Sequence, residues 1–256
     1  MAKHEGNRGT AAIGVVLAAL LLGVALVTTG YLAAQAVKYV KTFESSRLDV
    51  TGSADRVVTS DQVKWTASFG RRVDADSLSQ GYRLMAGDLD TVLKVLAQKG
   101  FTRDDLSIQP VSVTPVYRQC DSGASDCTQD VVGLDLAQYF TLSSGEVDEV
   151  TALAQDAQPF VDAGLSYQTV ALEYYYSGLA ALRPDLLAEA IKDARGRAQA
   201  VASATGASIG KLRSADSGVF QVTQLNSTDV SAYGVYDTST IQKRVTAVVH
   251  ASFALQ

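Results

Sequence analysis

The feature that most constrains this chain is a long uncharged stretch close to its N-terminus. No charged residue occurs from Gly9 to Val37, and the stretch from Ala11 to Tyr31 consists mainly of Ala, Val, Leu, Ile and Gly. A helix needs about 20 consecutive apolar residues to cross the hydrocarbon core of a bilayer. The sequence therefore predicts a transmembrane signal-anchor helix over residues 11–36, preceded by a short cytoplasmic tail over residues 1–10.

A cleavable signal sequence is the alternative, because Ala34-Gln35-Ala36 has the small-x-small pattern that signal peptidase recognises. Signal sequences usually carry an apolar stretch of about 7–15 residues, which is shorter than the one here. A retained anchor predicts a single-pass protein of the inner (cytoplasmic) membrane with its C-terminal domain in the periplasm. Cleavage would instead release that domain into the periplasm, and both alternatives export the rest of the chain.

The two cysteines also favour export. Cys120 and Cys127 are separated by six residues that are small or polar and typical of turns. We predict a disulfide between Cys120 and Cys127, which requires an oxidising compartment. The alternative is two unpaired surface thiols. A zinc site would need further Cys or His ligands, and the neighbouring sequence contains none.

Composition argues against several classes of function. The chain has 22 Lys and Arg against 27 Asp and Glu, and neither sign forms a long run, so nucleic acid is not expected as a partner. The only histidines are His4 and His250, and no G-x-S-x-G motif occurs. The spacing of Asp121, Asp126 and Asp130 does not match an EF-hand loop. We therefore predict no catalytic residue, no cofactor and no metal site, and a protein that is not an enzyme.

Hydrophobic periodicity predicts a domain of the α+β class after the apolar helix. Alternation of apolar and polar residues indicates strands, and apolar residues three and four apart indicate helices. The predicted strands cover residues 50–58, 62–73, 106–117, 131–142, 165–176, 219–225 and 244–255. The predicted helices cover residues 78–96, 146–163 and 184–205, and glycines at positions 100, 164 and 206 follow them as stop signals.

The order strand, helix, strand, strand occurs twice, which predicts an internal duplication built from antiparallel sheets. The predicted halves are residues 48–145 and 164–256, joined by the helix over residues 146–163. In the strand 165–176, simple alternation predicts one face with Val170, Leu172, Tyr174 and Tyr176 and the opposite face with Tyr167, Thr169, Ala171 and Tyr175.

Three segments point to a known family. Val50-Thr51-Gly52-Ser53-Ala54 opens the domain, the segment from Leu106 ends in Pro115-Val116-Tyr117, and an Ala-rich stretch over residues 188–198 is followed by Ala-Thr-Gly-Ala-Ser-Ile-Gly over residues 204–210. With these features, residues 48–256 resemble the SIMPL-domain family of bacterial periplasmic and envelope proteins, which includes oxidative-stress defence proteins and an outer-membrane antigen. The sequence departs from the expected pattern at the Cys120–Cys127 loop and at Asn226–Gln242.

The resemblance implies a duplicated α+β domain, a location in the cell envelope, and homo-oligomeric assemblies of ring or channel form. It supplies no catalytic residue, cofactor or substrate.

Tyrosines are the candidate interface residues. Tyr174, Tyr175 and Tyr176 follow one another near the end of a predicted strand, and Tyr233 and Tyr236 lie in the long segment between the last two predicted strands. Tyrosine is enriched at protein interfaces because its ring is apolar and its hydroxyl is polar.

The function expected from these features is that of a membrane-anchored, non-enzymatic protein that self-assembles in the cell envelope and acts in stress protection or as a channel or scaffold. Its expected partners are the membrane, further copies of itself and an envelope protein. One alternative is a binding module that holds a small molecule or polypeptide in a groove lined by tyrosines, among them Tyr167, and this alternative predicts a deep apolar pocket. Another is a hydrolase with a site assembled from distant residues.

Overall fold

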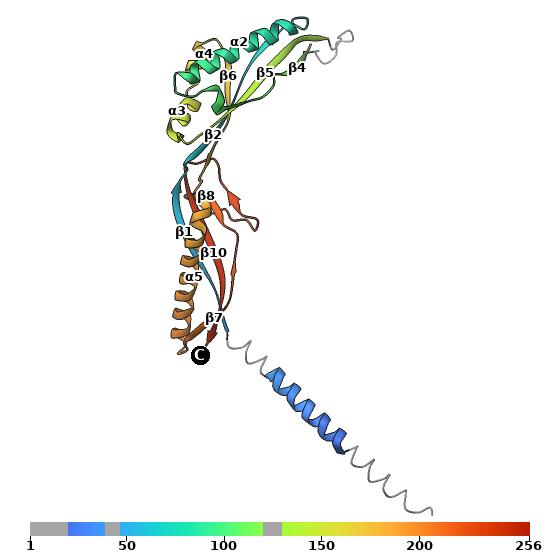
Figure 1. Cartoon of the computed structure of the whole chain (residues 1–256), viewed down its shortest axis with the longest axis vertical. Coiled ribbons are helices and arrows are strands. Elements are labelled where there is room, and N and C mark those ends of the chain that lie inside the picture. The colour runs from blue at the N-terminus through green and yellow to red at the C-terminus, as the bar shows by residue number, and fades with distance from the viewer. Residues whose placement is uncertain (1–19, 39–46, 120–129) are drawn as a thin grey trace, which may run out of the picture. The chain divides into compact units, whose positions relative to one another are not determined.

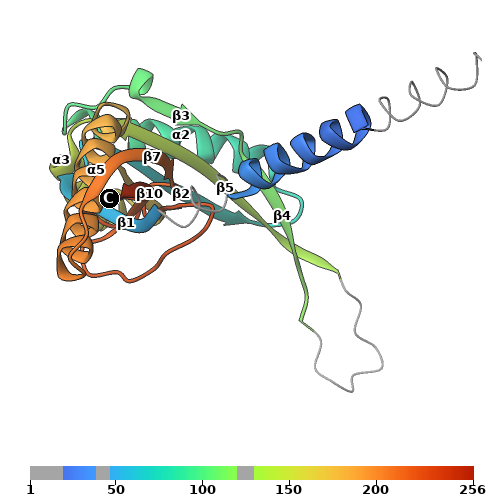
Figure 2. The same cartoon turned by 90° about the horizontal axis from the view of Figure 1, so that it is seen from below.

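The computed structural model describes residues 20–38, 47–119 and 130–256 (Figure 1, Figure 2). The predicted tail over residues 1–10, the first part of the predicted membrane helix, and both cysteines, Cys120 and Cys127, lie outside the described residues. The disulfide therefore stays a prediction. Leu20–Lys38 form an exposed helix that is long and apolar enough to cross a membrane. A signal sequence has the same properties, so this helix fits either alternative.

The rest of the described chain has the predicted α+β class, with two five-stranded sheets that are mainly antiparallel. The helices and strands in chain order are β1 (Arg47–Thr59), β2 (Gln62–Val73), α2 (Leu78–Ala97), the short 3-10 helix η1 (Arg103–Asp105), β3 (Leu106–Ile108), β4 (Ser112–Tyr117), β5 (Val131–Ser144), α3 (Val147–Gln155), α4 (Gln158–Asp162), β6 (Ser166–Tyr175), α5 (Leu179–Ala204), β7 (Ile209–Ser217), β8 (Gln221–Gln224), β9 (Val235–Tyr236) and β10 (Gln242–Leu255).

The chain divides into two compact units. The larger unit comprises Ala54–Glu189 and Gly218–Val248, and the smaller unit comprises Met1–Ser53, Ala190–Ser217 and Val249–Gln256. The elements β1, α5 and β10 contribute residues to both units.

The first sheet belongs to the larger unit and has the order β3-β5-β2-β6, with β4 also paired to β5. Helices α2, α3 and α4 pack against this sheet. Trp65 of β2 is fully buried at the centre of the core, with its ring centroid 5.4 Å from that of Phe140 in an edge-on arrangement. The indole Nε1–H of Trp65 donates to Thr169 Oγ1 at 3.2 Å, so the polar atom of this large side chain is satisfied.

The second sheet has the order β1-β10-β8-β9, with β7 also paired to β10. Alternate residues of β10 are buried, as the sequence pattern predicts. In the larger unit, the buried residues of β10 pack with the first part of α5 in one hydrophobic core. The buried residues of this core are Val58, Leu182, Leu186, Val222, Val245 and Ala247.

The core of the smaller unit depends on small side chains in α5. Ala194 and Ala198 pack with Ala251 and Phe253 of β10, and all four side chains are buried. On β1, a Cβ atom added at Gly52 would overlap the backbone carbonyl oxygen of Ala190 and the backbone nitrogen of Ala194. Glycine is therefore required at position 52, because α5 approaches the strand at backbone contact.

Two predicted elements are each divided in the structure. The predicted strand 106–117 is separate strands β3 and β4, because Pro110 interrupts the strand and cannot donate a ladder hydrogen bond. The predicted helix 146–163 is α3 followed by α4, with a break at Asp156 and Ala157 and with Pro159 in the first turn of α4.

Three other predictions of local structure were wrong or incomplete. Helix α5 begins at Leu179 rather than at Pro184, because Leu179 and Leu182 pack into the core of the larger unit. Strand β7 was not predicted, since its sequence has little apolar alternation and most of its residues are exposed. Strand β9 has only two residues, which is too short for a periodic signal.

The predicted faces of the strand 165–176 were also wrong. Alternation places Tyr167 and Tyr174 on opposite faces, yet both belong to the same core cluster. The pairing of β6 with β2 shifts between Thr66 and Ala67, where Ala171 and Thr169 are the successive partners and Val170 is left over. Such a bulge inserts one residue and reverses the parity of the faces on its two sides.

The predicted duplication stays a prediction. Each sheet takes a strand from the opposite predicted half of the chain, because β1 pairs with β10 and β6 pairs with β2. The two predicted halves therefore do not correspond to the two sheets.

We expect Gly52→Ala to lower the free energy of unfolding by about 1–3 kcal/mol, because the added methyl group meets backbone atoms of α5 that have no rotamer to change. Urea unfolding of the full chain in detergent, followed by circular dichroism at 222 nm, measures this loss. The control is Gly87→Ala in α2, where no atom lies within 4 Å of the added Cβ. The control should be stabilised by about 0.5–1 kcal/mol, and equal stability of the two variants would contradict the close contact.

Candidate functional site

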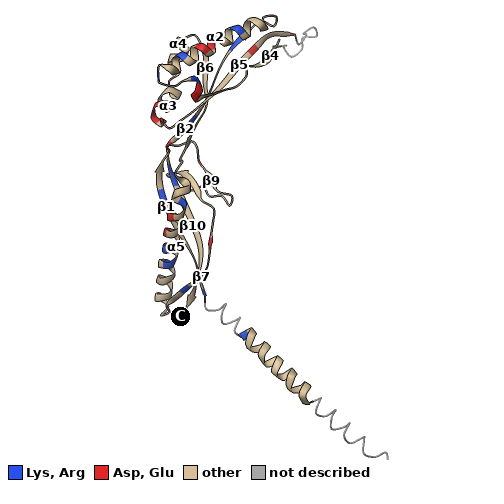
Figure 3. Ribbon diagram, viewed as in Figure 1, with Lys and Arg blue, Asp and Glu red and all other residues tan. Residues whose placement is uncertain are grey.

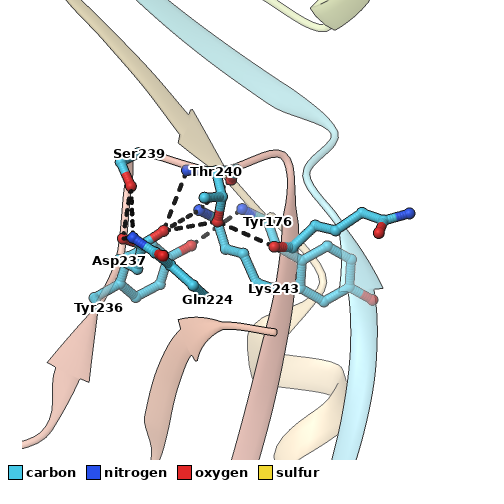
Figure 4. Close-up of polar contacts among 8 residues, drawn as sticks. Tyr176, Gln224, Tyr236, Asp237, Ser239, Thr240 and Lys243 are labelled. Atoms are coloured by element: carbon cyan, nitrogen blue, oxygen red, sulfur yellow. Dashed lines mark hydrogen bonds and ion pairs between the residues drawn. The ribbon is translucent and has the colours of Figure 1, made fainter. Parts of the chain in front are cut away.

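The candidate site lies in the larger unit, where the end of β6 meets the segment between β8 and β10 (Figure 4). The backbone N–H of Tyr176 donates to Tyr236 Oη at 3.0 Å, and the N–H of Tyr174 donates to the carbonyl oxygen of Thr238 at 2.8 Å. The rings of Tyr175 and Tyr236 have centroids 6.0 Å apart. The structure therefore brings Tyr175, Tyr176 and Tyr236 together, as a group that we name the tyrosine cluster.

Strand pairing explains why these segments meet. Within its sheet, β6 is an edge strand that pairs only with β2. The outward N–H groups at its end need acceptors, because an unpaired backbone donor is costly once water is excluded. The segment 236–238 supplies those acceptors to Tyr174 and Tyr176.

We name residues 225–241, which connect β8 to β10, the tyrosine loop. Two contacts hold its middle part. β9 pairs in parallel with β8, and the Nε2–H of Gln221 donates to the carbonyl oxygen of Ser231 at 2.7 Å. Gly234 has a φ of +87°, and a Cβ atom there would lie 3.1 Å from the carbonyl oxygen of Phe220. A glycine is favoured at this turn because other residues rarely adopt a positive φ.

A buried ion pair holds the base of the loop. Lys243 at the start of β10 has a fully buried side chain, and its ammonium donates to the carbonyl oxygen of Thr240 at 2.6 Å. The same ammonium lies 3.4 Å from Asp237 Oδ1. The Asp237 carboxylate also accepts hydrogen bonds from the Thr240 N–H at 3.2 Å, the Thr240 hydroxyl at 2.8 Å, the Ser239 hydroxyl at 2.9 Å and the Gln224 amide at 3.4 Å.

The electrostatics of this pair are those of a structural anchor. Burial alone would raise the pKa of Asp237, but hydrogen bonds from Thr240, Ser239 and Gln224, together with the charge of Lys243, outweigh burial and lower this pKa to about 2. Burial lowers the pKa of Lys243, and the neighbouring Asp237 carboxylate opposes that effect. The carboxylate is thus held as an anion with its lone pairs occupied, which suits it for fixing the loop.

The remaining predicted interface residues lie in contrasting surroundings. Tyr174 is only 5% exposed, and its hydroxyl lies 3.0 Å from Thr151 Oγ1 within the core. Tyr233 is 97% exposed, and Val230 in the same loop is 83% exposed. The tip of the tyrosine loop therefore presents large apolar side chains to solvent, whereas the side chain of Tyr174 is too buried to contact a partner.

Burial raises the pKa of the Tyr175 hydroxyl, and a hydrogen bond that it donates to Glu173 raises it further. Tyr167 has a pKa of about 12, mainly because of burial. These hydroxyl groups therefore stay protonated at neutral pH, and the Tyr175 hydroxyl acts as a hydrogen-bond donor to Glu173 rather than as a base.

A cavity of about 640 Å³ lies beside the loop. Its lining includes Gln224, Asn226, Asp229, Tyr236 and Asp237, so hydroxyl, amide and carboxyl groups dominate its surface. A tyrosine-lined groove for an apolar ligand would need a mainly apolar lining, which this cavity lacks. Within residues 20–38, 47–119 and 130–256, no three His, Cys, Asp or Glu side chains are grouped so as to hold a metal ion.

Sequence reasoning did not find Asp237 and Lys243. A signal was present, because Lys243 has the same parity as Val245 and Ala247, which face the core of the larger unit. A lysine on the buried face of a strand requires an anionic partner, and Asp237 is the acidic residue that precedes it most closely in the sequence. The predicted strand began at residue 244 and so excluded the lysine.

The histidine in β10 does not contribute to this cluster. His250 belongs to the smaller unit, where its side chain is exposed and its Nδ1 lies 3.0 Å from Thr51 Oγ1. This agrees with its parity, which is opposite to that of the buried Val249 and Ala251.

These features define a class of protein in which an α+β domain with two antiparallel-rich sheets follows an N-terminal apolar helix. The family model SIMPL, described as a protein of unknown function (DUF541), matches residues 48–253. The chain belongs to the SIMPL family, as the resemblance of its sequence indicates. No curated protein matches the chain.

We expect Asp237→Ala to lower the free energy of unfolding by about 3 kcal/mol, because it leaves the buried Lys243 ammonium without an anion. Lys243→Met should cost only about 1 kcal/mol, since Met fills the apolar space and the Asp237 carboxylate keeps its other donors. Chemical unfolding followed by the fluorescence of Trp65, the single tryptophan, measures both. A larger loss for Lys243→Met than for Asp237→Ala would contradict this account of the pair.

Acid pH should selectively weaken the wild-type chain. The folded pKa of Asp237 is about 2 against an ordinary value of 3.8, so its stabilising effect is complete above pH 4 and is lost as the pH falls through 2. The stability difference between wild type and Asp237→Asn should therefore shrink by about 2 kcal/mol between pH 5 and pH 2. Unfolding curves of both chains across this range test the shift, and a constant difference would refute the low pKa.

Proposed function

We propose that this chain is a membrane-anchored, non-enzymatic protein of the cell envelope that self-associates through its SIMPL domain. The helix Leu20–Lys38 serves as a retained anchor, and the domain lies in the periplasm. The assembly acts as a scaffold or channel, with stress protection as its physiological context. The single observation that carries this proposal is the solvent-exposed apolar tip of a loop whose base is fixed.

The tip consists of Val230 and Tyr233, which are 83% and 97% exposed. The base of the loop is held by the buried Lys243–Asp237 pair, and the hydrogen bond from Gln221 to Ser231 holds the backbone between Val230 and Tyr233. A loop held in this way loses little conformational entropy on binding, and this supports its use as a contact surface. Tyrosine and apolar side chains are the groups that proteins bury at the centre of an interface.

Confinement to a membrane supports assembly through so small a surface. Copies anchored by the helix Leu20–Lys38 would share one plane, which raises the effective concentration of one domain at another. Weak contacts between loops would then suffice for association. If the helix is instead cleaved as a signal sequence, the domain loses this advantage.

The alternatives receive less support. A module that captures an apolar ligand in a tyrosine-lined groove is not favoured by a cavity with a largely polar lining. Tyr167, which that alternative includes, stacks on Phe160 in the core with ring centroids 4.2 Å apart. No contact among the described residues favours a hydrolase.

We expect the full chain in detergent to form oligomers at micromolar concentration in size-exclusion chromatography with light scattering. The double variant Val230→Ser and Tyr233→Ser should weaken association by about tenfold or more, because it removes two apolar anchors from the interface. Since both side chains are exposed, folding should be unchanged.

The matched control is Tyr82→Ser with Leu84→Ser, which removes a tyrosine and an aliphatic residue that are 44% and 38% exposed on α2. The control should associate as wild type does. A monomeric wild-type chain would overturn self-association, and an equal loss in both variants would overturn the role of the tyrosine loop.

A further inference from the structure

Charge is divided unevenly between the two units of the domain. In the smaller unit, residues 47–53, 190–217 and 249–256 contain six basic and three acidic residues, a net charge of +3. The larger unit contains 12 basic and 22 acidic residues, a net charge of −10. We name the six basic residues of 47–53, 190–217 and 249–256 the basic collar: Arg47, Lys192, Arg195, Arg197, Lys211 and Arg213. Figure 3 colours Lys and Arg blue along the ribbon.

Half of the basic collar has no counter-ion among the residues that the structure describes. All six side chains are exposed. Arg47 pairs with Asp49 at 3.2 Å, and Arg197 pairs with Asp193 at 2.8 Å. By contrast, no residue in the described part of the chain forms an ion pair with Lys192, Arg195 or Lys211. These three cations remain able to bind an external anion.

The geometry of α5 spreads the collar around the smaller unit. Ala194 and Ala198 face the sheet, so with 3.6 residues per turn Arg195 and Arg197 project from opposite flanks of the helix. The carboxylate of Asp193 accepts a hydrogen bond from the Ser53 N–H of β1 at 2.9 Å, and Arg197 lies one turn further on the same flank. Arg195 therefore lies on the flank of β7, the strand that contributes Lys211 and that pairs with β10.

Chain connectivity limits the distance between the basic collar and the apolar helix Leu20–Lys38. Ile209, the first residue of β7, pairs with Leu255, and both Ile209 and Leu48 pack in the same core cluster. The starts of β1 and β7 therefore lie at one end of the smaller unit. Only nine residue steps separate Lys38 from Arg47, and an extended chain of that length spans at most about 32 Å.

From this combination of charge and connectivity we propose that the basic collar binds the anionic headgroups of the membrane that the apolar helix enters. The inference rests on the proposed membrane anchoring. Attraction between a Lys or Arg side chain and an anionic bilayer acts within a Debye length, about 10 Å at 0.1 M salt. The short connection to the helix holds the collar at high local concentration beside the headgroups, whereas the acidic larger unit is repelled by the same surface.

The test uses the full chain in nanodiscs of phosphatidylcholine alone or of phosphatidylcholine mixed equally with phosphatidylglycerol. An amine-acylating reagent labels exposed lysines, and mass spectrometry measures the rate at each site. We expect Lys192 and Lys211 to react about fivefold more slowly in the anionic discs than in the neutral discs. At high salt their reaction rates should return to those in the neutral discs. Lys94 and Lys99, which are exposed in the larger unit, are internal controls whose rates should respond little to the lipid.

Two double variants, each of which removes two positive charges, make the test more specific. Lys192→Gln with Arg195→Gln should reduce the protection of Lys211 by anionic lipid, whereas Lys94→Gln with Lys99→Gln should leave it unchanged. Circular dichroism confirms that each variant is folded. Loss of protection in both double variants would overturn a specific role for the collar.

The experiment distinguishes two hypotheses, membrane anchoring by the apolar helix and binding of anionic lipid by the basic collar. If the full chain does not co-purify with neutral nanodiscs, the proposed anchoring fails. If the chain is anchored but Lys192 and Lys211 react at equal rates in neutral and anionic discs, the anchoring stands and the lipid contact is overturned. Protection that is independent of lipid charge, as a contact between copies would produce, also overturns it.

Discussion

A buried ammonium group cannot remain charged without an anion, and this constraint organises the candidate site. Lys243 is fully buried, so its ammonium needs a carboxylate and a carbonyl oxygen beside it. The residues just before Lys243 in the chain must therefore fold back to place these groups there. Asp237 and Thr240 supply these groups, and in doing so they fix the base of the tyrosine loop. The same turn brings Thr238 and Tyr236 to the end of β6, where they accept hydrogen bonds from the N–H groups of Tyr174 and Tyr176. The Lys243–Asp237 pair thus fixes the tyrosine loop in the position that provides hydrogen-bond acceptors at the end of β6.

Much of the fold follows from local sequence patterns. Strands β2 and β10 and helix α2 have strong periodicity and long sequences, and their observed limits lie within two residues of those predicted. The α+β class followed from such elements, whereas the family followed from residues 50–54, from the segment ending in Pro115-Val116-Tyr117, and from the Ala-rich segment of α5 with residues 204–210. Failure occurred where tertiary contacts override local pattern: β7 is held by its pairing to β10, although its own sequence has little alternation.

The candidate site was predicted only in part, for an identifiable reason. Tyrosine content indicated Tyr175, Tyr176 and Tyr236, which the structure places together. The exposure of each tyrosine depends on parity along β6, and the bulge at Val170 reverses that parity within the strand. A single inserted residue is invisible to a pattern with a period of two. Alternation alone therefore placed Tyr174 and Tyr167 on opposite faces, although both lie in one core.

The two proposed contacts respond to salt in opposite ways. The larger unit has a net charge of −10, so side-by-side copies repel one another and the apolar tip of the tyrosine loop must overcome that repulsion. Added salt screens this repulsion and favours association between copies. It also screens the attraction between the basic collar and anionic headgroups, and so weakens contact with the membrane. Because the net negative charge and the basic collar lie in different units, ionic strength would shift the balance between a domain held at the bilayer surface and domains held to one another.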